Sequence, residues 1–152
     1  MILTAFTRAG RPRTKGSLRA TCTRVPGHKV RYEEEVKGSS LWRKQMAKAA
    51  QVAHLKLTDG VLFNYASPVE VKATFVFERT MSAAGGPIPS HDTPYPTDIH
   101  LGDVDKLTRN LLDALTDSHV IADDSYVVTI TCHKRWAREG EEPGVIVQVE
   151  AL

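Results

Sequence analysis

The chain has 152 residues, of which 41% are hydrophobic and 25% are charged, and its formal net charge is +2. These values are ordinary for a globular protein, and the length suits one domain over residues 1–152 with a core of its own. No apolar run is long enough to span a membrane and the first residues lack a signal-peptide pattern, so we expect a cytoplasmic protein without a membrane partner. Cys22 and Cys132 lack the spacing of metal ligands, and we expect both to be reduced.

The small net charge hides two segments of opposite sign. Residues 8–48 contain twelve Lys or Arg against three Glu, whereas residues 98–124 contain seven Asp against two basic residues. A nuclease needs both kinds of segment, because cations hold phosphates and carboxylates hold a metal ion. The alternative is a solvated basic surface without a ligand, which is the more common meaning of scattered Lys and Arg.

The N-terminal part predicts a strand followed by a basic loop. Residues 2–8 form the expected strand. Residues 9–31 are rich in Arg, Lys, Gly and Pro, and Pro12 and Pro26 break regular structure there. The loop either contacts a DNA backbone or is an ordinary surface loop, and the acidic segment elsewhere in the chain favours DNA contact. The basic residues of this loop that we expect to contact DNA are Arg11, Arg13, Lys15 and Arg19.

A helix and the clearest strand come next. Residues 32–57 predict a helix, because apolar side chains recur at offsets of three and four. That apolar stripe contains Trp42, Met46, Ala49, Ala53 and Leu57. We expect Trp42 in the core rather than stacked on a base, and His54 as a surface histidine or a hydrogen-bonded one. Residues 69–79 alternate apolar and polar side chains, which is typical of a half-buried strand in an antiparallel sheet.

The stretch 80–101 predicts a long loop, because four prolines and a Gly-Gly pair exclude regular structure there. A loop of this length in a compact domain is usually functional or disordered. Its place directly before the acidic segment makes it a candidate gate for DNA access. His91 and His100 invite a catalytic role, but an HNH-type nuclease needs further histidine and asparagine partners that cannot be identified in the sequence.

Two further strands follow the acidic segment. Residues 125–136 are rich in Val, Ile and Thr and predict a strand, and Lys134 and Arg135 near its end are placed to reach nucleic acid. Residues 145–151 alternate again after a polar turn and predict a final hairpin strand. The predicted order is β-α-β-α-β-β, which indicates an α+β fold with a mixed β-sheet and two packed helices.

Residues 102–124 form the acidic stretch around which the rest is organised. Its apolar positions, spaced for one buried stripe of a helix, are Val104, Leu107, Leu111 and Leu115. Asp103 falls at the N-cap and Asp105 in the first turn, where the positive end of the helix dipole favours ionised carboxylates. Asp123 and Asp124 form a second acidic pair at the head of the following strand.

The two acidic pairs predict a divalent-metal site. If the strand lies beside the N-terminus of the helix, Asp103, Asp105 and Asp124 converge, and such oxygen ligands suit Mg²⁺ or Mn²⁺. The same residues also have a plain explanation. An Asp at an N-cap is ordinary helix chemistry, and an Asp-Asp pair before a strand is ordinary turn chemistry.

This stretch resembles the RusA-type Holliday junction resolvases. The shared pattern runs over 26 residues without a gap and comprises Asp103-Val104-Asp105, Arg109, Asp113-Ala114-Leu115-Thr116, Asp123-Asp124 and Val127-Val128. The early strand followed by Gly10-Arg11-Pro12-Arg13 is also similar to phage members of the family. The resemblance implies a RusA-like fold and a homodimer that cuts four-way DNA junctions with magnesium in recombination and repair. A phage-encoded member works in the host cytoplasm.

The resemblance also implies roles for single residues. Asp103, Asp105 and Asp124 correspond to the three magnesium-binding aspartates, with Asp123 beside them, and Mn²⁺ is a possible substitute. Arg109 stands where the family has an essential lysine, so we expect it to act in catalysis together with the three aspartates.

Two positions depart from the family pattern. Lys106 replaces an asparagine and Tyr126 replaces a common glutamine, which leaves the preferred cutting sequence open. We expect Lys106, Lys134 and Arg135 to contact DNA.

Two other functions stay open from the sequence. The protein is either a broader nuclease of branched DNA, such as flaps, forks and Y-junctions, or a non-catalytic DNA-binding protein whose acids only cap a helix. A panel of branched DNAs tests the first alternative and a magnesium titration of nicking tests the second.

Overall fold

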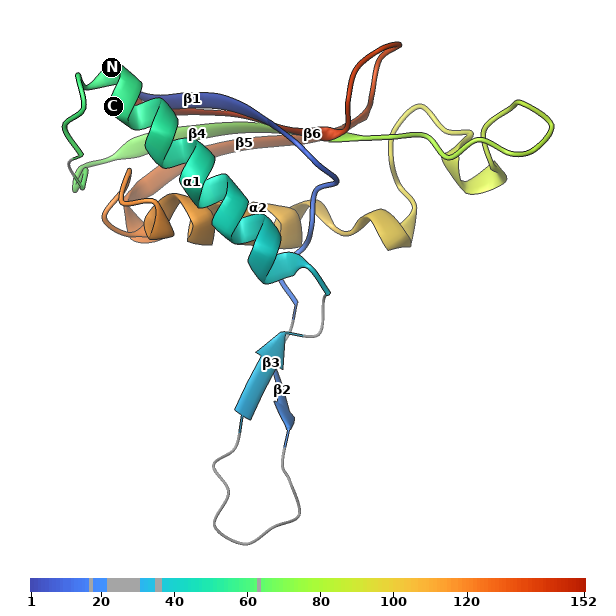
Figure 1. Cartoon of the computed structure of the whole chain (residues 1–152), viewed down its shortest axis with the longest axis horizontal. Coiled ribbons are helices and arrows are strands. Elements are labelled where there is room, and N and C mark those ends of the chain that lie inside the picture. Colours follow the sequence, from blue (N-terminus) through green and yellow to red (C-terminus); the bar gives the residue numbers. More distant parts are fainter. Residues whose placement is uncertain (17, 22–30, 35–36, 63) are drawn as a thin grey trace, which may run out of the picture.

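Four strands form one mixed sheet in the order β1-β6-β4-β5 (Figure 1). Their bounds in that order are Ile2–Ala9, Gly144–Ala151, Val69–Phe77 and Val127–Trp136. β6 pairs antiparallel with β1 and β4, whereas β5 pairs parallel with β4. This computed structural model describes residues 1–16, 18–21, 31–34, 37–62 and 64–152. The prediction of an α+β fold with a mixed sheet and two packed helices is confirmed.

Both described α-helices, α1 (Ser39–Leu57) and α2 (Val104–Asp117), pack on the same face of the sheet and against each other. The core between them takes alternate side chains of β4, from Val69 to Phe77, so the predicted alternation is confirmed. α2 contributes the fully buried Leu107, Leu111 and Leu115. Neither α1 nor α2 is long and apolar enough to cross a membrane.

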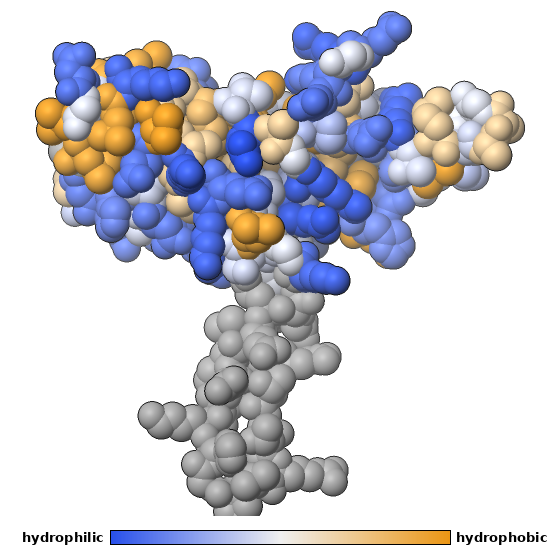
Figure 2. All heavy atoms as spheres, viewed as in Figure 1, coloured by the Kyte–Doolittle hydropathy of each residue, from blue (hydrophilic) through white to orange (hydrophobic). Residues whose placement is uncertain are grey.

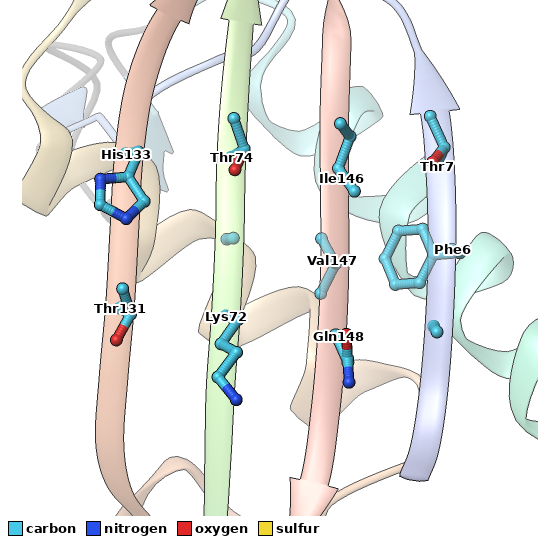
Figure 3. A pocket seen from close by; sticks show the side chains of 11 residues that line it. Phe6, Thr7, Lys72, Thr74, Thr131, His133, Ile146, Val147 and Gln148 are labelled. Carbon is cyan, nitrogen blue, oxygen red and sulfur yellow. The ribbon is translucent and has the colours of Figure 1, made fainter.

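The opposite face of the sheet carries polar side chains around a shallow hollow of about 590 Å³ (Figure 3). The polar side chains of the hollow are Thr7, Lys72, Thr74, Thr131, His133 and Gln148. Lys72 forms an ion pair with Glu70 at 3.0 Å, and the hydrogen bond between them raises the pKa of Lys72. No aspartate of the predicted metal site lines this hollow.

The predicted helix over residues 32–57 is wrong in its first part. Arg31–Glu34 form β3, which pairs antiparallel with β2 (Leu18–Thr21), and this hairpin projects away from the sheet (Figure 1). α1 begins only at Ser39, because the preceding Gly38 has φ 83° and a left-handed residue interrupts a helix. The loop predicted over residues 9–31 therefore contains β2, while Cys22 and Pro26 lie outside the described residues.

The buried stripe of α1 is also shifted from the predicted one. It consists of Ser39, Trp42, Met46, Ala50 and His54, and Leu57 is exposed. The expected core position of Trp42 is confirmed. His54 is the hydrogen-bonded kind of histidine, since its Nδ1 lies 2.6 Å from the carbonyl oxygen of Leu3.

The predicted final hairpin is wrong. β6 does not pair with β5 but lies between β1 and β4, where every second side chain from Val145 to Val149 is buried. A strand with neighbours on both sides saturates its backbone hydrogen bonds and leaves β5 at the sheet edge. The edge position of β5 sets the geometry of the acidic residues described next.

Candidate active site

The N-terminal end of α2 presents two exposed carboxylates. Asp103 is the N-cap, because its carbonyl accepts a hydrogen bond from the Leu107 N–H at 3.0 Å, but its side chain caps no backbone N–H. Instead the Asp103 carboxylate pairs with Lys106 at 3.1 Å, and Asp105 pairs with Arg109 at 3.5 Å. All four side chains are more than half exposed. Such ion pairs hold weakly, so both carboxylates are available to another cation.

A basic segment, residues 11–15, lies along α2 and reaches from its N-terminal end to Asp113. The Arg11 guanidinium donates a hydrogen bond to the backbone carbonyl of His100 at 3.1 Å. The backbone N–H of Lys15 donates a hydrogen bond to the backbone carbonyl of Lys106, also at 3.1 Å. The Lys15 ammonium forms an ion pair with Asp113 at 2.7 Å. The structure therefore brings the predicted DNA-binding segment next to the first acidic pair.

Asn110, which was not predicted as a site residue from the sequence, holds this segment in place. Its side chain is fully buried, and its Nδ2 donates to the Arg13 carbonyl at 2.9 Å and to the Ser39 hydroxyl at 3.2 Å. Asn110 thereby joins the basic segment to the start of α1. An asparagine directly before Leu111 in an apolar stripe was the available signal, because a buried amide requires hydrogen-bond partners.

Gly102 connects the basic segment, α2 and β5. It has φ 89°, and a Cβ placed on it would overlap the Cγ2 atom of Thr14. Its carbonyl oxygen accepts a hydrogen bond from the Lys134 ammonium at 2.8 Å. The C-terminal end of β5 therefore lies beside the N-terminal end of α2.

Arg135 takes a different position from Lys134. Its guanidinium donates two hydrogen bonds to Glu141, both at 2.6 Å, and this contact lowers the pKa of Glu141 to about 2. Neighbouring residues of a strand point to opposite faces, so Arg135 points to the helix-free face of the sheet. Arg19 belongs to β2, and its side chain lies outside the described part of the structure.

The second acidic pair lies at the other end of α2. Asp123 precedes the short helix η3 (Asp124–Tyr126) and accepts a hydrogen bond from the Ser125 N–H at 2.9 Å. Hydrogen bonds from the Ser125 hydroxyl and backbone lower the pKa of Asp123. Both acids line a hollow of about 330 Å³ together with Arg43, Asp113, Thr116 and Asp117. Asp113, Thr116 and Asp117 belong to the C-terminal half of α2.

The two acidic pairs are therefore far apart within one chain. α2 has 14 residues, which corresponds to a helix about 21 Å long between Asp103 and the neighbourhood of Asp124. β5 gives a second, independent measure. Lys134 contacts the start of α2, and it lies seven residues along the strand from Val127, or about 23 Å. β5 runs opposite to α2, so its far end, not the end that carries Asp124, lies beside Asp103 and Asp105.

The described residues of a single chain contain no group of three or more His, Cys, Asp or Glu side chains placed to hold a metal ion. The condition under which Asp103, Asp105 and Asp124 converge, a strand that begins beside the helix N-terminus, is not met within one chain. Arg109 stays close to Asp105, and Lys106 to Asp103.

The long loop before α2 is held by a histidine. The buried His91 accepts a hydrogen bond at Nδ1 from the Thr80 N–H at 2.8 Å, and its Nε2 lies 3.6 Å from Asp98. The Trp136 indole packs against this imidazole and donates to the Thr93 carbonyl at 2.8 Å. The loop contains two short 3-10 helices, Pro89–His91 and Ile99–Leu101, where we predicted no regular structure.

The site combines exposed aspartates at both ends of one helix with a basic segment along it. Comparison with known proteins adds that residues 9–150 match the family described as Endodeoxyribonuclease RusA. No curated protein matches the chain. The match includes both acidic pairs, the basic segment and all of α1, α2, β4 and β5. On a match of this extent, the chain belongs to the RusA endodeoxyribonuclease family, the Holliday junction resolvases that hydrolyse DNA at branch points.

Proposed function

We propose that the protein resolves four-way DNA junctions by paired nicks in recombination and repair, as a homodimer that depends on Mg²⁺, with Mn²⁺ as a substitute. The observation that carries this proposal is the family match over residues 9–150, in a chain whose α2 has exposed aspartates at both ends. We assign Asp103, Asp105 and Asp124 to cleavage, with Asp123 beside them.

The basic residues around α2 supply the DNA contacts in this proposal. Arg11, Arg13, Lys15 and Lys134 lie within or next to the segment that runs along Asp103 and Asp105. A phosphate close to the carboxylates gains favourable charge from these side chains, which offsets its repulsion by the acids. Further contacts are assigned to Lys106, Arg19 and Arg135. Arg135 is the least available of them, because Glu141 occupies both of its terminal nitrogens.

Arg109 has two roles in the proposal. In the free protein it forms an ion pair with Asp105 at 3.5 Å and reduces the repulsion among the acids. When DNA is bound, its exposed guanidinium is long enough to turn to a phosphate, with which arginine forms strong paired hydrogen bonds.

The acidic residues fit a divalent ion in their chemistry but not in their placement within one chain. Carboxylates are the ligands that Mg²⁺ and Mn²⁺ prefer. Ligands of one ion, however, must lie within a few ångströms of each other, whereas α2 holds Asp105 and Asp124 at opposite ends. A single chain therefore does not supply the complete ligand set.

Cleavage of labelled synthetic DNA tests the proposal. We expect the wild-type protein to nick a four-way junction with Mg²⁺ and to leave it intact with a chelator. We expect Asp105→Asn to bind the junction but not cut it, because the amide keeps the shape of the side chain and removes its charge. Cutting that is equally fast without any divalent ion, or in Asp105→Asn, would contradict the proposal.

The choice of substrate is tested in the same assay. A panel of a four-way junction, a flap, a fork, a Y-junction and a plain duplex separates a junction resolvase from a broader nuclease of branched DNA. We expect paired, symmetric nicks on the four-way junction and the slowest cutting on the duplex. Equal rates on all branched substrates would favour the broader nuclease.

A further inference from the structure

A second apolar stripe of α1 lies beside the buried one and faces β1 instead of the core. Exposed apolar side chains gather at the end of the molecule that carries the chain termini (Figure 2). A groove of about 790 Å³ between α1 and β1 belongs to this region, and Ile2, Val52 and Leu57 in it are 48%, 43% and 55% exposed. The apolar side chains that line the groove include Ala49, Val52, Ala53 and Leu57 of α1 and Ile2 and Phe6 of β1. An open apolar groove of this kind marks a surface that a partner covers.

One wall of the groove is an open edge of the sheet. β1 is the first strand in the order β1-β6-β4-β5, so β6 is its only partner among the described strands. Hydrogen-bonded and non-hydrogen-bonded pairs alternate in an antiparallel ladder, and Gly10 donates a hydrogen bond to the Pro143 carbonyl next to this ladder. In that register the backbone N–H and C=O groups of Ala5 and Thr7, which line the groove, point away from β6. The Leu3 carbonyl next to them already accepts a hydrogen bond from α1, at 2.6 Å from His54 Nδ1.

Both walls of the groove are basic. α1 contains four Lys or Arg and no Asp or Glu, and β1 contains one Arg and no Asp or Glu. Arg8, Lys48 and Lys56 line the groove and are exposed, and no acidic side chain is among the described residues that line it. The whole chain has 20 Lys or Arg against 18 Asp or Glu, so this excess of one sign is local. Complementary charge selects binding partners, and the occupant of this groove is therefore acidic.

We propose that the groove is a docking site for an extended acidic segment of a partner protein, which pairs with the open edge of β1 as an additional strand. The backbone of the segment bonds to Ala5 and Thr7, and its alternate side chains point into the groove. Its apolar side chains contact Val52, and its carboxylates pair with Lys48 and Lys56. The proposal does not rest on the nuclease function, because no residue of α2 and neither acidic pair lines the groove.

The spacing of the two lysines sets the pattern of the segment. Lys48 and Lys56 are eight residues apart in α1, which corresponds to about 12 Å along the helix. An extended chain covers this distance in about four residues, and its side chains face the same way at every second residue. The segment therefore has the pattern acid-x-apolar-x-acid. Ala49 and Ala53, the small side chains between the lysines, leave room for the central apolar side chain.

Two other occupants fit the groove less well. A second copy of the chain, docked on this groove about a twofold axis, sets the same cations against each other, which is unfavourable. Nucleic acid pairs with the cations, but its charged backbone leaves the apolar side chains of the groove uncovered. An acidic segment with an apolar centre satisfies the cations, the apolar side chains and the backbone groups of β1 together.

Docking at β1 leaves the proposed DNA site accessible. β1 and β5 are the opposite edges of the sheet, three strand spacings or about 14 Å apart. The acidic pairs lie at the ends of α2 and before β5, and neither is covered by a segment that lies along β1. A partner docked in this way holds the protein without competing for the residues assigned to cleavage.

Titration of the ¹⁵N-labelled protein with synthetic peptides tests the proposal. The probe is a pool of short peptides with the central pattern acid-x-apolar-x-acid, in which the apolar residue is Val, Ile, Leu or Phe. A control pool has lysine in place of both acids. We expect the acidic pool to shift amide signals of β1 and of the α1 side that faces it, and the control pool to bind about tenfold more weakly or worse. No binding of the acidic pool at about 1 mM, or shifts located elsewhere, would overturn the proposal.

N-methylation of the peptide tests whether it binds as a strand. Only every second amide of an added strand donates a hydrogen bond to its neighbour. We expect methylation of one set of alternate amides to weaken binding about tenfold or more, and methylation of the other set to have little effect. Equal effects of both sets would show that the peptide does not pair with β1.

Variants of the groove test its individual contacts. Ala53→Leu fills the groove without changing its charge, and we expect it to weaken peptide binding about tenfold or more. Val52→Glu, at an exposed position, should give a similar loss by repelling the acids, whether or not Ala53→Leu folds. Lys48→Gln should weaken binding about two- to fivefold, because exposed ion pairs are weak. Lys44→Gln is the matched control, since Lys44 is exposed on α1 but does not line the groove.

The same variants separate the peptide from the two other occupants. A change of oligomeric state in Val52→Glu, measured by sedimentation, would assign the groove to a second copy and overturn the proposal. Loss of DNA affinity in Lys48→Gln but not in Lys44→Gln, without loss of peptide binding, would assign it to nucleic acid and overturn the proposal equally. A protein that binds the acidic peptides but cuts no branched DNA would refute only the proposed function.

Discussion

The two ends of α2 carry the same chemical groups in different settings. At the N-terminal end, Asp103 and Asp105 are paired only with exposed cations of their own helix. At the C-terminal end, Asp123 and Asp124 differ in their hydrogen bonds. Asp123 accepts a hydrogen bond from the Ser125 N–H, whereas Asp124 is exposed and makes no such cap.

The difference shows how an aspartate used for structure differs from one that is free to bind a ligand. Asp123 stabilises a turn, and its lowered pKa reflects hydrogen bonds that it already makes. Asp103 stands at an N-cap without capping, so its charge is directed outward. The position of an aspartate in the sequence motif therefore does not tell whether it stabilises a turn or is available to bind a ligand. Its hydrogen-bond partners in the structure do.

The largest expected effect separates Asp124 from Asp123. We expect Asp124→Asn to lower the rate of junction nicking by at least about 100-fold, because loss of even an outer partner of a metal ligand costs about 10- to 100-fold. Asp123→Asn keeps an oxygen that accepts the Ser125 hydrogen bond, so we expect a much smaller loss. Single-turnover nicking rates measure both. Equal losses in the two variants would show that Asp123 also acts in the reaction.

The next effect concerns Gly102, which precedes the N-terminal end of α2 and contacts the basic segment. Gly102→Ala places a Cβ against Thr14 and also strains a backbone with φ 89°. We expect a loss of about 2–4 kcal/mol in the free energy of unfolding, since a left-handed non-glycine residue alone costs about 1–3 kcal/mol. Denaturant unfolding measures it.

Gly85→Ala is the matched control for this change. Gly85 also has φ 89°, but a Cβ there meets no atom within 4 Å. We expect Gly85→Ala to lower the free energy of unfolding only by the cost of a left-handed backbone at a non-glycine residue. Thr14→Ala in the Gly102→Ala background removes the overlapping methyl group, so the stability should return to the level of Gly85→Ala. If the second substitution restores nothing, contact with Thr14 is not the reason that position 102 is glycine.

A smaller effect concerns the salt dependence of DNA binding, which we compare between a residue of the basic segment and a residue at the C-terminal end of α1. We expect Arg11→Gln to reduce the slope of log binding constant against log salt by about 1, because one phosphate contact is lost. Lys56 is exposed near the C-terminal end of α1 and lines a groove between α1 and β1. Lys56→Gln should leave the slope unchanged. The same change in both variants would show that DNA is attracted by overall charge, not by the segment along α2.

The sequence predicted what is set by local periodicity. The alternation in β4 and the leucine stripe of α2 report burial directly, and the N-cap position of Asp103 follows from the start of that stripe. The acidic stretch also contains enough of the RusA pattern for its residues alone to indicate the family, which the match over residues 9–150 confirms.

What the sequence did not predict depends on contacts distant along the chain. Arg31–Glu34 form a strand only because Leu18–Thr21 lie opposite, and polar residues next to a helix give no sign of that pairing. The place of β6 between β1 and β4 is likewise a matter of topology. The direction of β5 relative to α2 decides that Asp124 lies far from Asp103, and no residue pattern encodes that direction.

The smallest expected effect concerns the ion pair on the helix-free side of β5. The Arg135 guanidinium lowers the pKa of Glu141 from an ordinary 4.5 to about 2. A carboxyl group with a lowered pKa in the folded state stabilises the protein above its unfolded value, and this contribution is lost as the pH falls from about 4.5 to about 2. Because both side chains are at least a quarter exposed, solvent screens the pair and the effect is small. We expect Glu141→Gln to melt slightly below the wild type at pH 6, with the difference gone near pH 2, and junction nicking at neutral pH to be unchanged. A difference in melting temperature that stays constant across this range would mean that the charge of Glu141 does not account for it.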